Sequence, residues 1–421
     1  MPLSRRRFLQ GLSLAAVAAA AEACAGPGPT SPASASVATP GASPTAWAAA
    51  SPTATAEPTA TAGPTAEPSP SPTSSPDPAA LRRKIGGLLV VGFRGLTVSS
   101  GDPVARAIVE EGLGGVILFA RDGLTNGSRN IASPTQLADL TGHLRELAGR
   151  PLFIAVDQEG GTVARLTPAN GFPATVSEAS IGTKDDVANA LAIGRATAHT
   201  LKAAGIDWNL APVVDLNVNP SNPSIGALGR SFSADPDVVV AMAGAIVQAH
   251  REQGILTALK HFPGLGSATG DTDRGFVDLT GTWHAAELEP FRRLVADNHA
   301  DCVMVANSFN GQIDATYPAT LSVKTVQGRL RGDIGWDGLV VTDDLQAGAI
   351  RSGYNDATAV RLSMAAGCDV LLFANQQVYV PDVASRVIDT IVGLVAAGTI
   401  DEAAIDTSLA RISAVRSALG G

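Results

Sequence analysis

Short apolar runs recur along the chain from residue 88 onward, and longer segments separate them. Runs of this length are typical of buried strands. Eight runs fit this pattern: Leu88–Phe93, Gly115–Phe119, Leu152–Val156, Ile206–Leu210, Ile255–Leu259, Cys302–Ala306, Gly338–Val341 and Asp369–Phe373. Segments with helical spacing lie between them, including Val104–Glu111, Gln136–Leu147, Val187–Ala204, Val238–Gln253 and Ala285–Ala296. Strands that alternate with helices predict a parallel sheet.

The number of strand–helix units predicts how this sheet closes. Eight units predict an α/β fold of the (β/α)8 TIM-barrel type, in a single catalytic domain over residues 79–421. An open doubly wound sheet is the main alternative. The dinucleotide-binding pattern Gly-x-Gly-x-x-Gly does not follow the first apolar run, which disfavours that alternative.

The first 24 residues are typical of an export signal. Ser4-Arg5-Arg6-Arg7-Phe8-Leu9 precedes an Ala-rich apolar run that ends in Ala21-Glu22-Ala23-Cys24. A charged start, a short apolar run and a small-residue cleavage site predict a secretory signal peptide. The consecutive arginines indicate twin-arginine export, and the run is too short for a membrane-spanning helix. Cys24 is either the lipid-modified first residue of a mature lipoprotein or a spectator at an ordinary cleavage site.

Residues 25–78 consist almost entirely of Pro, Ala, Ser, Thr and Gly. Because such a segment cannot bury a core, we expect a disordered, extended tether. A tether directly after Cys24 favours the lipoprotein alternative. We therefore expect an exported monomer, held at the outer face of the cytoplasmic membrane by a lipid or released to the outside.

Charge and composition narrow the range of partners. The formal net charge is -9 and no basic run follows the signal segment, so nucleic acid is not an expected partner. No His, Cys and carboxylate cluster has the spacing of metal ligands, and we expect no metal and no cofactor. Cys302 and Cys368 lie where apolar runs begin, which predicts buried core thiols.

Charged residues gather where the apolar runs end. Asp157 follows the third run, Lys260 and His261 follow the fifth, and Asp343 follows the seventh. The carboxyl ends of the strands share one rim in a barrel, so these side chains are expected to face a common pocket, as in catalytic barrels. Asp344, one residue further on, is expected to cap the next helix.

The binding roles of these residues follow from charge. Asp157 lies close to Arg165 in sequence, and this pair is expected to bind a polar ligand. Lys260 needs a partner of opposite charge, since it directly follows a buried strand. Arg230 lies in a Gly-rich loop and is either a surface residue or a substrate contact. His261 is either a substrate contact or a structural imidazole.

Paired carboxylates with these binding groups predict glycoside hydrolysis. Asp343 lies at a strand end, which suits a group that attacks the anomeric carbon and requires accurate placement. Asp271 and Asp273 lie on the loop after His261, which suits an acid/base that closes over the substrate.

Three blocks of sequence resemble the signature of glycoside hydrolase family 3: Asp157-Gln158-Glu159-Gly160-Gly161, Lys260-His261-Phe262-Pro263-Gly264 and Val341-Thr342-Asp343-Asp344-Leu345. The similarity covers residues 80–421 and is greatest to single-domain β-N-acetylglucosaminidases that act on peptidoglycan fragments. It implies that Asp343 is the nucleophile of a retaining reaction with a covalent glycosyl intermediate. It also implies sugar-binding roles for Asp157, Arg165, Arg230, Lys260 and His261.

The loop departs from the pattern of that family. The family's Asp-Ser-His, whose His is the acid/base, is Asp271-Thr272-Asp273 here, the usual Pro-Gly-His-Gly carries Leu265, and the strand-6 His is replaced by Asn307. Either Asp273 is the acid, with a pKa raised by Asp271, or His284 moves into the site, or the protein mainly binds sugar. An Asp would also repel phosphate, which predicts a hydrolase rather than a phosphorylase.

The sequence therefore predicts an exported, retaining β-N-acetylglucosaminidase that acts on cell-wall-derived β-linked N-acetylglucosamine. Two alternatives remain. One is a β-glucosidase or xylosidase of the same family, and the other is a catalytically weak lipoprotein that binds wall sugars.

Overall fold

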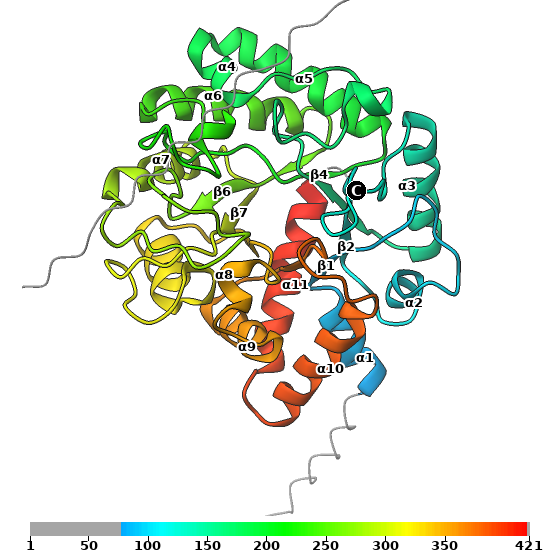
Figure 1. Cartoon of the computed structure of the whole chain (residues 1–421). Coiled ribbons are helices and arrows are strands. Elements are labelled where there is room, and N and C mark those ends of the chain that lie inside the picture. The colour runs from blue at the N-terminus through cyan, green and yellow to red at the C-terminus, as the bar shows by residue number, and fades with distance from the viewer. Residues whose placement is uncertain (1–76, 419–421) are drawn as a thin grey trace, which may run out of the picture. The chain divides into compact units, whose positions relative to one another are not determined.

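The computed structural model describes residues 77–418 (Figure 1). The predicted signal peptide, Cys24 and residues 25–76 of the predicted tether lie outside the described residues. The first helix begins at Pro78, and Asp77 caps it by accepting the N–H of Ala79 at 3.0 Å.

Parallel strands form the centre of the described part. They are β1 (Leu89–Gly92), β2 (Gly115–Ile117), β3 (Phe153–Val156), β4 (Trp208–Asn209), β5 (Leu256–Thr257), β6 (Leu259–Phe262), β7 (Cys302–Val305), β8 (Leu339–Thr342) and β9 (Leu371–Phe373). Two sheets with the orders β5-β4-β3-β2-β1-β9 and β6-β7-β8 contain them. β5 and β6 are halves of one strand that is interrupted at Ala258.

Two further contacts join these sheets into a closed barrel. Val213, just beyond β4, pairs in parallel with Lys260 of β6, and Val341 of β8 pairs in parallel with Val370 before β9. β9 in turn pairs with β1. The (β/α)8 barrel prediction is thus confirmed and the open sheet is excluded, because no edge between neighbouring strands remains unjoined.

All eight predicted apolar runs contain strand residues, but the fifth strand is longer than predicted. β6 continues to Phe262, so Lys260 and His261 lie inside the strand rather than after it. A strand can contain a buried Lys here because its ammonium group has carboxylate partners across the barrel, described below. Sequence patterning alone gave no sign of those partners.

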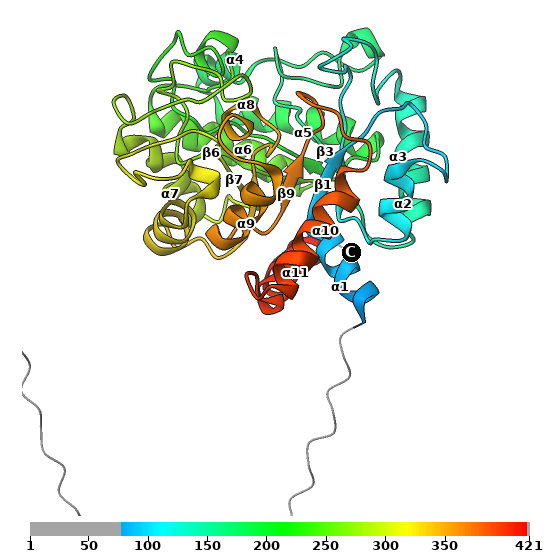
Figure 2. The ribbon, with the colours of Figure 1, turned by 60° about the horizontal axis from the view of Figure 1, so that its bottom comes forward.

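Helices surround the strands (Figure 1). They are α1 (Pro78–Gly86), α2 (Pro103–Val109), α3 (Pro134–Ala148), α4 (Glu178–Lys184), α5 (Val187–Ala203), α6 (Pro236–Arg251), α7 (Glu289–Ala296), α8 (Gly348–Arg351), α9 (Asp356–Ala366), α10 (Val383–Ala396) and α11 (Glu402–Ala418). A π-helical segment spans Lys324–Asp333. α1, α10 and α11 lie together on one side of the barrel (Figure 2).

Local sequence explains where several helices begin. Ser133 accepts the N–H of Gln136 at the start of α3, and Asp186 accepts the N–H groups of Ala188 and Asn189 at the start of α5. Such caps satisfy backbone donors that have no partner within the helix. Proline in the first turn of α2, α3 and α6 supports the same boundaries.

The two remaining cysteines are buried and are not joined in a disulfide. Burial raises the pKa of the Cys302 and Cys368 thiols above their usual value. They are therefore poor nucleophiles, as predicted for core thiols. Among residues 77–418, no helix combines the length and apolar character required to cross a membrane.

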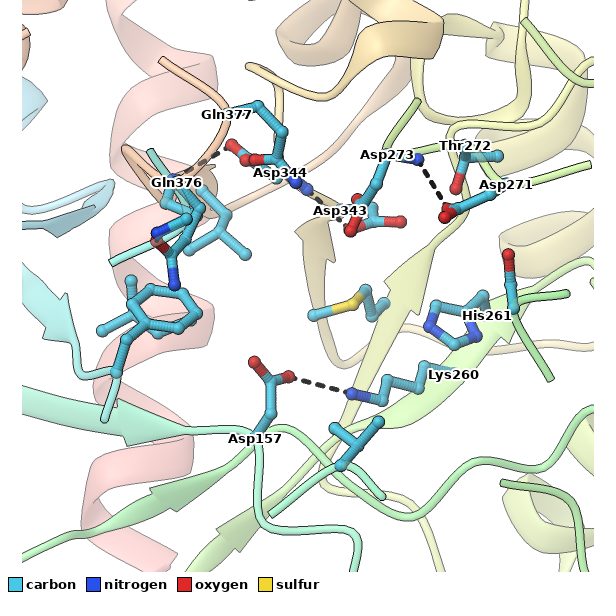
Figure 3. A pocket seen from close by; sticks show the side chains of 18 of the residues that line it. Asp157, Lys260, His261, Asp271, Thr272, Asp273, Asp343, Asp344, Gln376 and Gln377 are labelled. Atoms are coloured by element: carbon cyan, nitrogen blue, oxygen red, sulfur yellow. Dashed lines mark hydrogen bonds and ion pairs between the residues drawn. The ribbon is translucent and has the colours of Figure 1, made fainter. Parts of the chain in front are cut away.

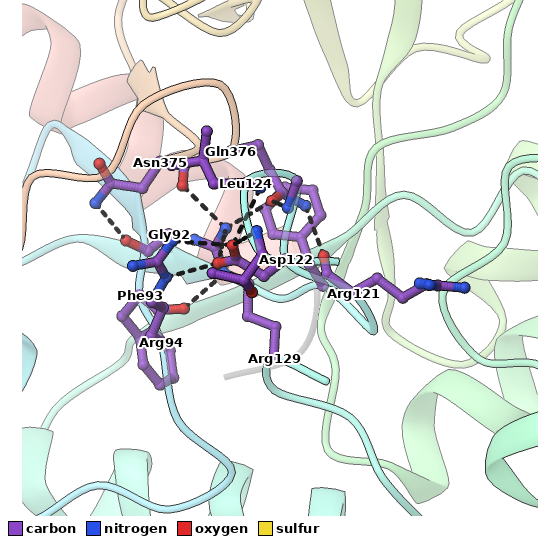
Figure 4. A network of polar contacts seen from close by, with 12 residues as sticks. Gly92, Phe93, Arg94, Arg121, Asp122, Leu124, Arg129, Asn375 and Gln376 are labelled. Carbon is purple, nitrogen blue, oxygen red and sulfur yellow. Dashed lines mark hydrogen bonds and ion pairs between the residues drawn. The ribbon is translucent and has the colours of Figure 1, made fainter. Parts of the chain in front are cut away.

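A buried polar network joins the carboxyl ends of β1, β2 and β9 (Figure 4). Arg129 donates to the carbonyl oxygens of Phe93 at 2.8 Å, Ala374 at 3.0 Å and Asn375 at 2.9 Å, and to Gln376 Oε1 at 2.7 Å. Burial lowers the pKa of Arg129 to about 10. The network fixes the loop after β9, which forms one wall of the cavity described next.

Candidate active site

A cavity of about 620 Å³ opens at the carboxyl ends of the strands. All eight side chains selected from the sequence line it: Asp157, Arg165, Arg230, Lys260, His261, Asp271, Asp273 and Asp343. Figure 3 shows Asp157 and Lys260 on one side of this space and Asp343 and Asp273 on the other. The predicted convergence of strand ends therefore occurs.

Lys260 is the central cation of the cavity floor. Its Nζ lies 3.0 Å from Asp157 Oδ1 and 2.7 Å from Glu159 Oε1, and its side chain is only 2% exposed. Arg165 Nη2 contacts Asp157 Oδ2 at 3.0 Å. Burial disfavours the charged form of Asp157, but Lys260 and Arg165 outweigh it and keep the pKa of this carboxyl below its usual value. The predicted partner of Lys260 is thus present.

Arg230 is a partly buried residue, with a side chain that is 14% exposed, rather than a freely exposed surface residue. Its Nε and Nη2 donate to Glu159 at 2.7 and 2.8 Å, and Nη1 donates to the carbonyl of Ser224 at 2.7 Å. Against the effect of burial, Arg230 and Lys260 lower the pKa of Glu159 to about 2. Sequence reasoning missed Glu159, although side chains two residues apart on an extended segment share a face, and Asp157 had been selected.

His261 is held by a carboxylate that was also missed. Its Nδ1 lies 2.6 Å from Asp215 Oδ2, while Asp215 Oδ1 accepts the backbone N–H groups of His261 and Leu265. A proton on Nδ1 satisfies this contact and leaves Nε2 as an acceptor, 3.4 Å from Arg230 Nη2. Asp215 therefore sets the orientation of the imidazole.

A further carboxyl group, that of Glu178, lies near Glu159 but outside the cavity lining. Glu178 accepts the N–H of Val213 at 3.0 Å through Oε1, and its Oε2 has no hydrogen-bond partner among the described residues. Burial and the nearby charge of Glu159 raise the pKa of Glu178 well above its usual value. This environment favours the neutral form of Glu178, which adds no charge beneath the ion pairs.

Asp343 follows β8 and faces the cavity. Its backbone N–H donates to the carbonyl of Val305 at 3.0 Å, which fixes it to β7. Within residues 77–418 its side chain accepts one hydrogen bond, from the N–H of Asp344 to Oδ1 at 2.7 Å. The other carboxylate oxygen remains available to a ligand in the cavity.

The loop that carries Asp271 and Asp273 packs on the first turn of α8. The N–H of Gly348 donates to the carbonyl of Asp273, and the N–H of Ala349 to that of Thr272, both at 2.9 Å. A side chain at Gly348 would lie 2.5 Å from the backbone of Arg274. Because Gly348 has no side chain, the loop can pack directly against the first turn of α8.

Of the two loop carboxyl groups, that of Asp273 is better suited to hold a proton. Its N–H donates to Asp271 Oδ1 at 3.0 Å, and the residue remains exposed at the mouth of the cavity. Burial of the carboxyl group among the surrounding walls, with the charges of Asp343 and Asp271, raises the pKa of Asp273 to about 6.

One sequence-based expectation was wrong, and one of the alternatives for the acid has no support from side-chain positions. Asp344 does not cap the next helix, because α8 begins four residues later with Ala347 at the cap position. Asp344 instead lines the cavity. His284 is exposed at the start of the short 3-10 helix Ala285–Leu288 and does not line the cavity, so it does not supply the missing imidazole in this structure.

Comparison with known proteins gives a consistent result. The model of the family described as Glycosyl hydrolase family 3 N terminal domain matches residues 80–415. A curated relative is the β-hexosaminidase of Xylella fastidiosa strain 9a5c, which is 35% identical over 300 residues that cover 69% of this chain and 84% of the relative.

Solved structures agree in fold as well as sequence. A β-N-acetylhexosaminidase from Beutenbergia cavernae DSM 12333 superposes with a TM-score of 0.72 at 31% identity, covering 80% of this chain and 98% of that one. A glycoside hydrolase family 3 β-N-acetylglucosaminidase from Paenibacillus sp. str. FPU-7 also gives 0.72, at 32% identity. That match covers 81% of this chain and 63% of the longer Paenibacillus chain.

Proposed function

This chain belongs to glycosyl hydrolase family 3 and is a glycosidase of the β-hexosaminidase type, and we propose that it removes terminal β-linked N-acetylglucosamine through a covalent intermediate on Asp343. The relatives named above support the choice of sugar. The observation that carries the proposed chemistry is the available Asp343 oxygen facing the charged floor across a cavity of about 620 Å³.

In this proposal the sugar binds to the charged floor of the cavity, which consists of Asp157, Glu159, Arg165, Arg230 and Lys260. Asp157 and Glu159 accept hydrogen bonds from hydroxyl groups, while Lys260, Arg165 and Arg230 donate them. Each of these groups already has a partner of opposite charge, so the floor is organised before the substrate arrives. Such preorganisation lowers the cost of placing the anomeric carbon beside Asp343.

In the first step, a carboxylate oxygen of Asp343 forms a bond to the anomeric carbon. The bond from that carbon to the leaving oxygen breaks, and protonated Asp273 transfers its proton to this oxygen. The products are an ester between the sugar and Asp343, a released alcohol, and an ionised Asp273. The raised pKa of Asp273 supports this role, because a general acid must hold a proton near the working pH.

In the second step, ionised Asp273 removes a proton from a water molecule. The water oxygen bonds to the anomeric carbon, the ester bond breaks, and Asp343 is again a carboxylate. Two displacements at the same carbon retain its configuration. Asp271 accepts the N–H of Asp273 and so orients the loop for both steps.

We further propose that the substrates come from the cell wall and that the protein acts outside the cytoplasm. The signal-like segment and Cys24 support export and a lipid anchor. Metabolic labelling with a radioactive fatty acid, compared between the full chain and Cys24→Ser, tests the anchor. Incorporation that persists without Cys24 would refute it.

A panel of nitrophenyl glycosides tests the activity. We expect fastest hydrolysis of the β-N-acetylglucosaminide by the unaltered protein, and loss of turnover with retained sugar binding in Asp343→Asn. A 2-fluoro sugar should add one sugar mass to the peptide that contains Asp343. Faster turnover of the glucoside or xyloside would favour the alternative glycosidases. Binding of wall fragments without turnover would favour the catalytically weak lipoprotein, an alternative that is supported by the absence of the loop His.

A further inference from the structure

Asp344 is a carboxyl group that the proposed reaction does not use, although it lies beside the attacking residue. It lines the cavity and is 5% exposed. Its Oδ1 accepts the N–H groups of Gln346 and Ala374, both at 3.0 Å. Its Oδ2 is buried and has no hydrogen-bond partner among residues 77–418. An oxygen in this situation is costly to ionise.

The backbone of Asp344 fixes the nucleophile. Its N–H donates to Asp343 Oδ1 at 2.7 Å, and its carbonyl accepts from Asn307 Nδ2 at 2.7 Å. The side chain connects the same turn to β9 through Ala374. A displacement of Asp344 would therefore also displace Asp343. Because Oδ2 is buried away from the cavity surface, Asp344 is unsuited to protonate a substrate directly.

The charges that face Asp344 are mostly negative. Asp343 comes from the end of β8 and Asp273 from the loop after β6, while no group on β9 beside it is titratable. Arg129 interacts electrostatically with Asp344 but is engaged with carbonyl groups, and no cation of the described residues lies within ion-pair distance of Asp344. Burial and the charges of Asp273 and Asp343 raise the pKa of Asp344 to about 7, against the opposing effect of its two N–H donors.

We propose that Asp344 is a positioning residue that works in its neutral, protonated form, holding the turn that carries Asp343 without adding a negative charge beside it. An ionised Asp344 would be an unpaired buried charge that is relieved only by movement toward water. Such movement would take the turn with it and misplace the Asp343 carboxylate. The inference rests on the proposed function, since it concerns the nucleophile of that reaction.

The test is the pH profile of kcat/KM on dinitrophenyl β-N-acetylglucosaminide, whose leaving group needs no acid. With this substrate, the unaltered enzyme should lose about tenfold by pH 8 relative to its plateau, because about one molecule in eleven still holds the proton. Asp344→Asn keeps the shape and the acceptor oxygen, so it should remain active at pH 6 and show no such decline. Asp344→Ala should be impaired at every pH.

Asp314→Asn is a matched control. Asp314 is also a buried aspartate, and its carboxyl accepts from Thr316 and Ser322 outside the cavity wall. The kcat/KM of Asp314→Asn should decline with pH as in the unaltered enzyme. Parallel declines in Asp344→Asn and the unaltered enzyme would overturn the proposal, as would a folded Asp344→Asn that loses more than a hundredfold at pH 6. If Asp344→Asn does not fold, the pH profile of the unaltered enzyme is the test. A kcat/KM on the dinitrophenyl substrate that stays constant through pH 8 would refute the proposal.

Unfolding by urea without substrate supplies a readout independent of catalysis. The raised pKa of Asp344 means that its contribution to stability is present at low pH and is lost as the pH rises through about 7. The urea midpoint should therefore fall less between pH 5 and pH 8 in Asp344→Asn than in the unaltered protein. Equal shifts would count against the proposal. A protein that hydrolyses no N-acetylglucosaminide would refute the proposed function, while this comparison would still test Asp344.

Discussion

Replacing Asp273 by Asn removes the group proposed to protonate the leaving oxygen while preserving the size of the side chain. The unperturbed carboxyl has a pKa of 3.8, and the cavity raises it to about 6. At pH 7, about one Asp273 in eleven then holds a proton, against roughly one in 1,600 for an unperturbed carboxyl. The environment therefore supplies roughly 150 times more of the acid form.

This shift predicts both a pH profile and a dependence on leaving group. On an N-acetylglucosaminide with an alkyl or sugar leaving group, kcat/KM of the unaltered enzyme should fall about tenfold below its plateau by pH 7, and more steeply above pH 7, where Asp344 also ionises. Asp273→Asn should reduce that kcat/KM by about 10² to 10⁴. With a dinitrophenyl leaving group, the loss in kcat/KM should be under about tenfold, because this group departs without a proton.

The assay compares both substrates across pH 5 to 9 with two controls. Asp278→Asn changes an exposed carboxyl further along the loop, which accepts the N–H of Thr280 and lies outside the cavity wall. His284→Ala removes the alternative acid. Both controls should resemble the unaltered enzyme. Equal losses of Asp273→Asn on the two substrates, or a large loss confined to His284→Ala, would refute the assignment of Asp273.

Three further outcomes are expected. Lys260→Met should lower the free energy of unfolding by about 3 kcal/mol, because it removes the shared cation of Asp157 and Glu159, and a loss below about 1 kcal/mol in urea titration would contradict this. Added phosphate should not speed turnover, since the negative charge of Asp273 repels it, and formation of a sugar phosphate detected by mass spectrometry would disprove the argument. Glu178→Gln should gain stability relative to the unaltered protein as the pH rises from 5 to 8, because the raised pKa of Glu178 means that its stabilising contribution is lost at higher pH, and a constant difference would show that Glu178 is already ionised.

The sequence predicted the barrel because parallel strands buried on both faces are continuous apolar runs. It also predicted which charged residues converge, since each strand of a barrel delivers the residue after it to one rim. Asp157 and Asp343 could therefore be placed in the same cavity although they come from different strands. These conclusions require only local sequence and the rules of parallel strand packing.

The pairing of charges could not be read in the same way. Arg230 and Glu159 are 71 positions apart, and His261 and Asp215 are 46 apart, so their contacts depend on how the loops fold back over the rim. The function of Asp344 was misjudged for a related reason. A carboxylate after a strand and before a helix is typical of a cap, but the N–H of Ala374, 30 positions later, competes for the same oxygen.

The packing of the loop against Gly348 connects the two carboxylates that are proposed to react, Asp273 and Asp343. Asp343 precedes α8 by a few residues, and the loop backbone around Asp273 rests on the first N–H groups of that helix. A loop that carries a histidine in place of Asp273 would have to make the same two backbone contacts with α8. An engineered transplant of such a loop should therefore include the start of α8, because this segment supports both the loop and the turn that carries Asp343.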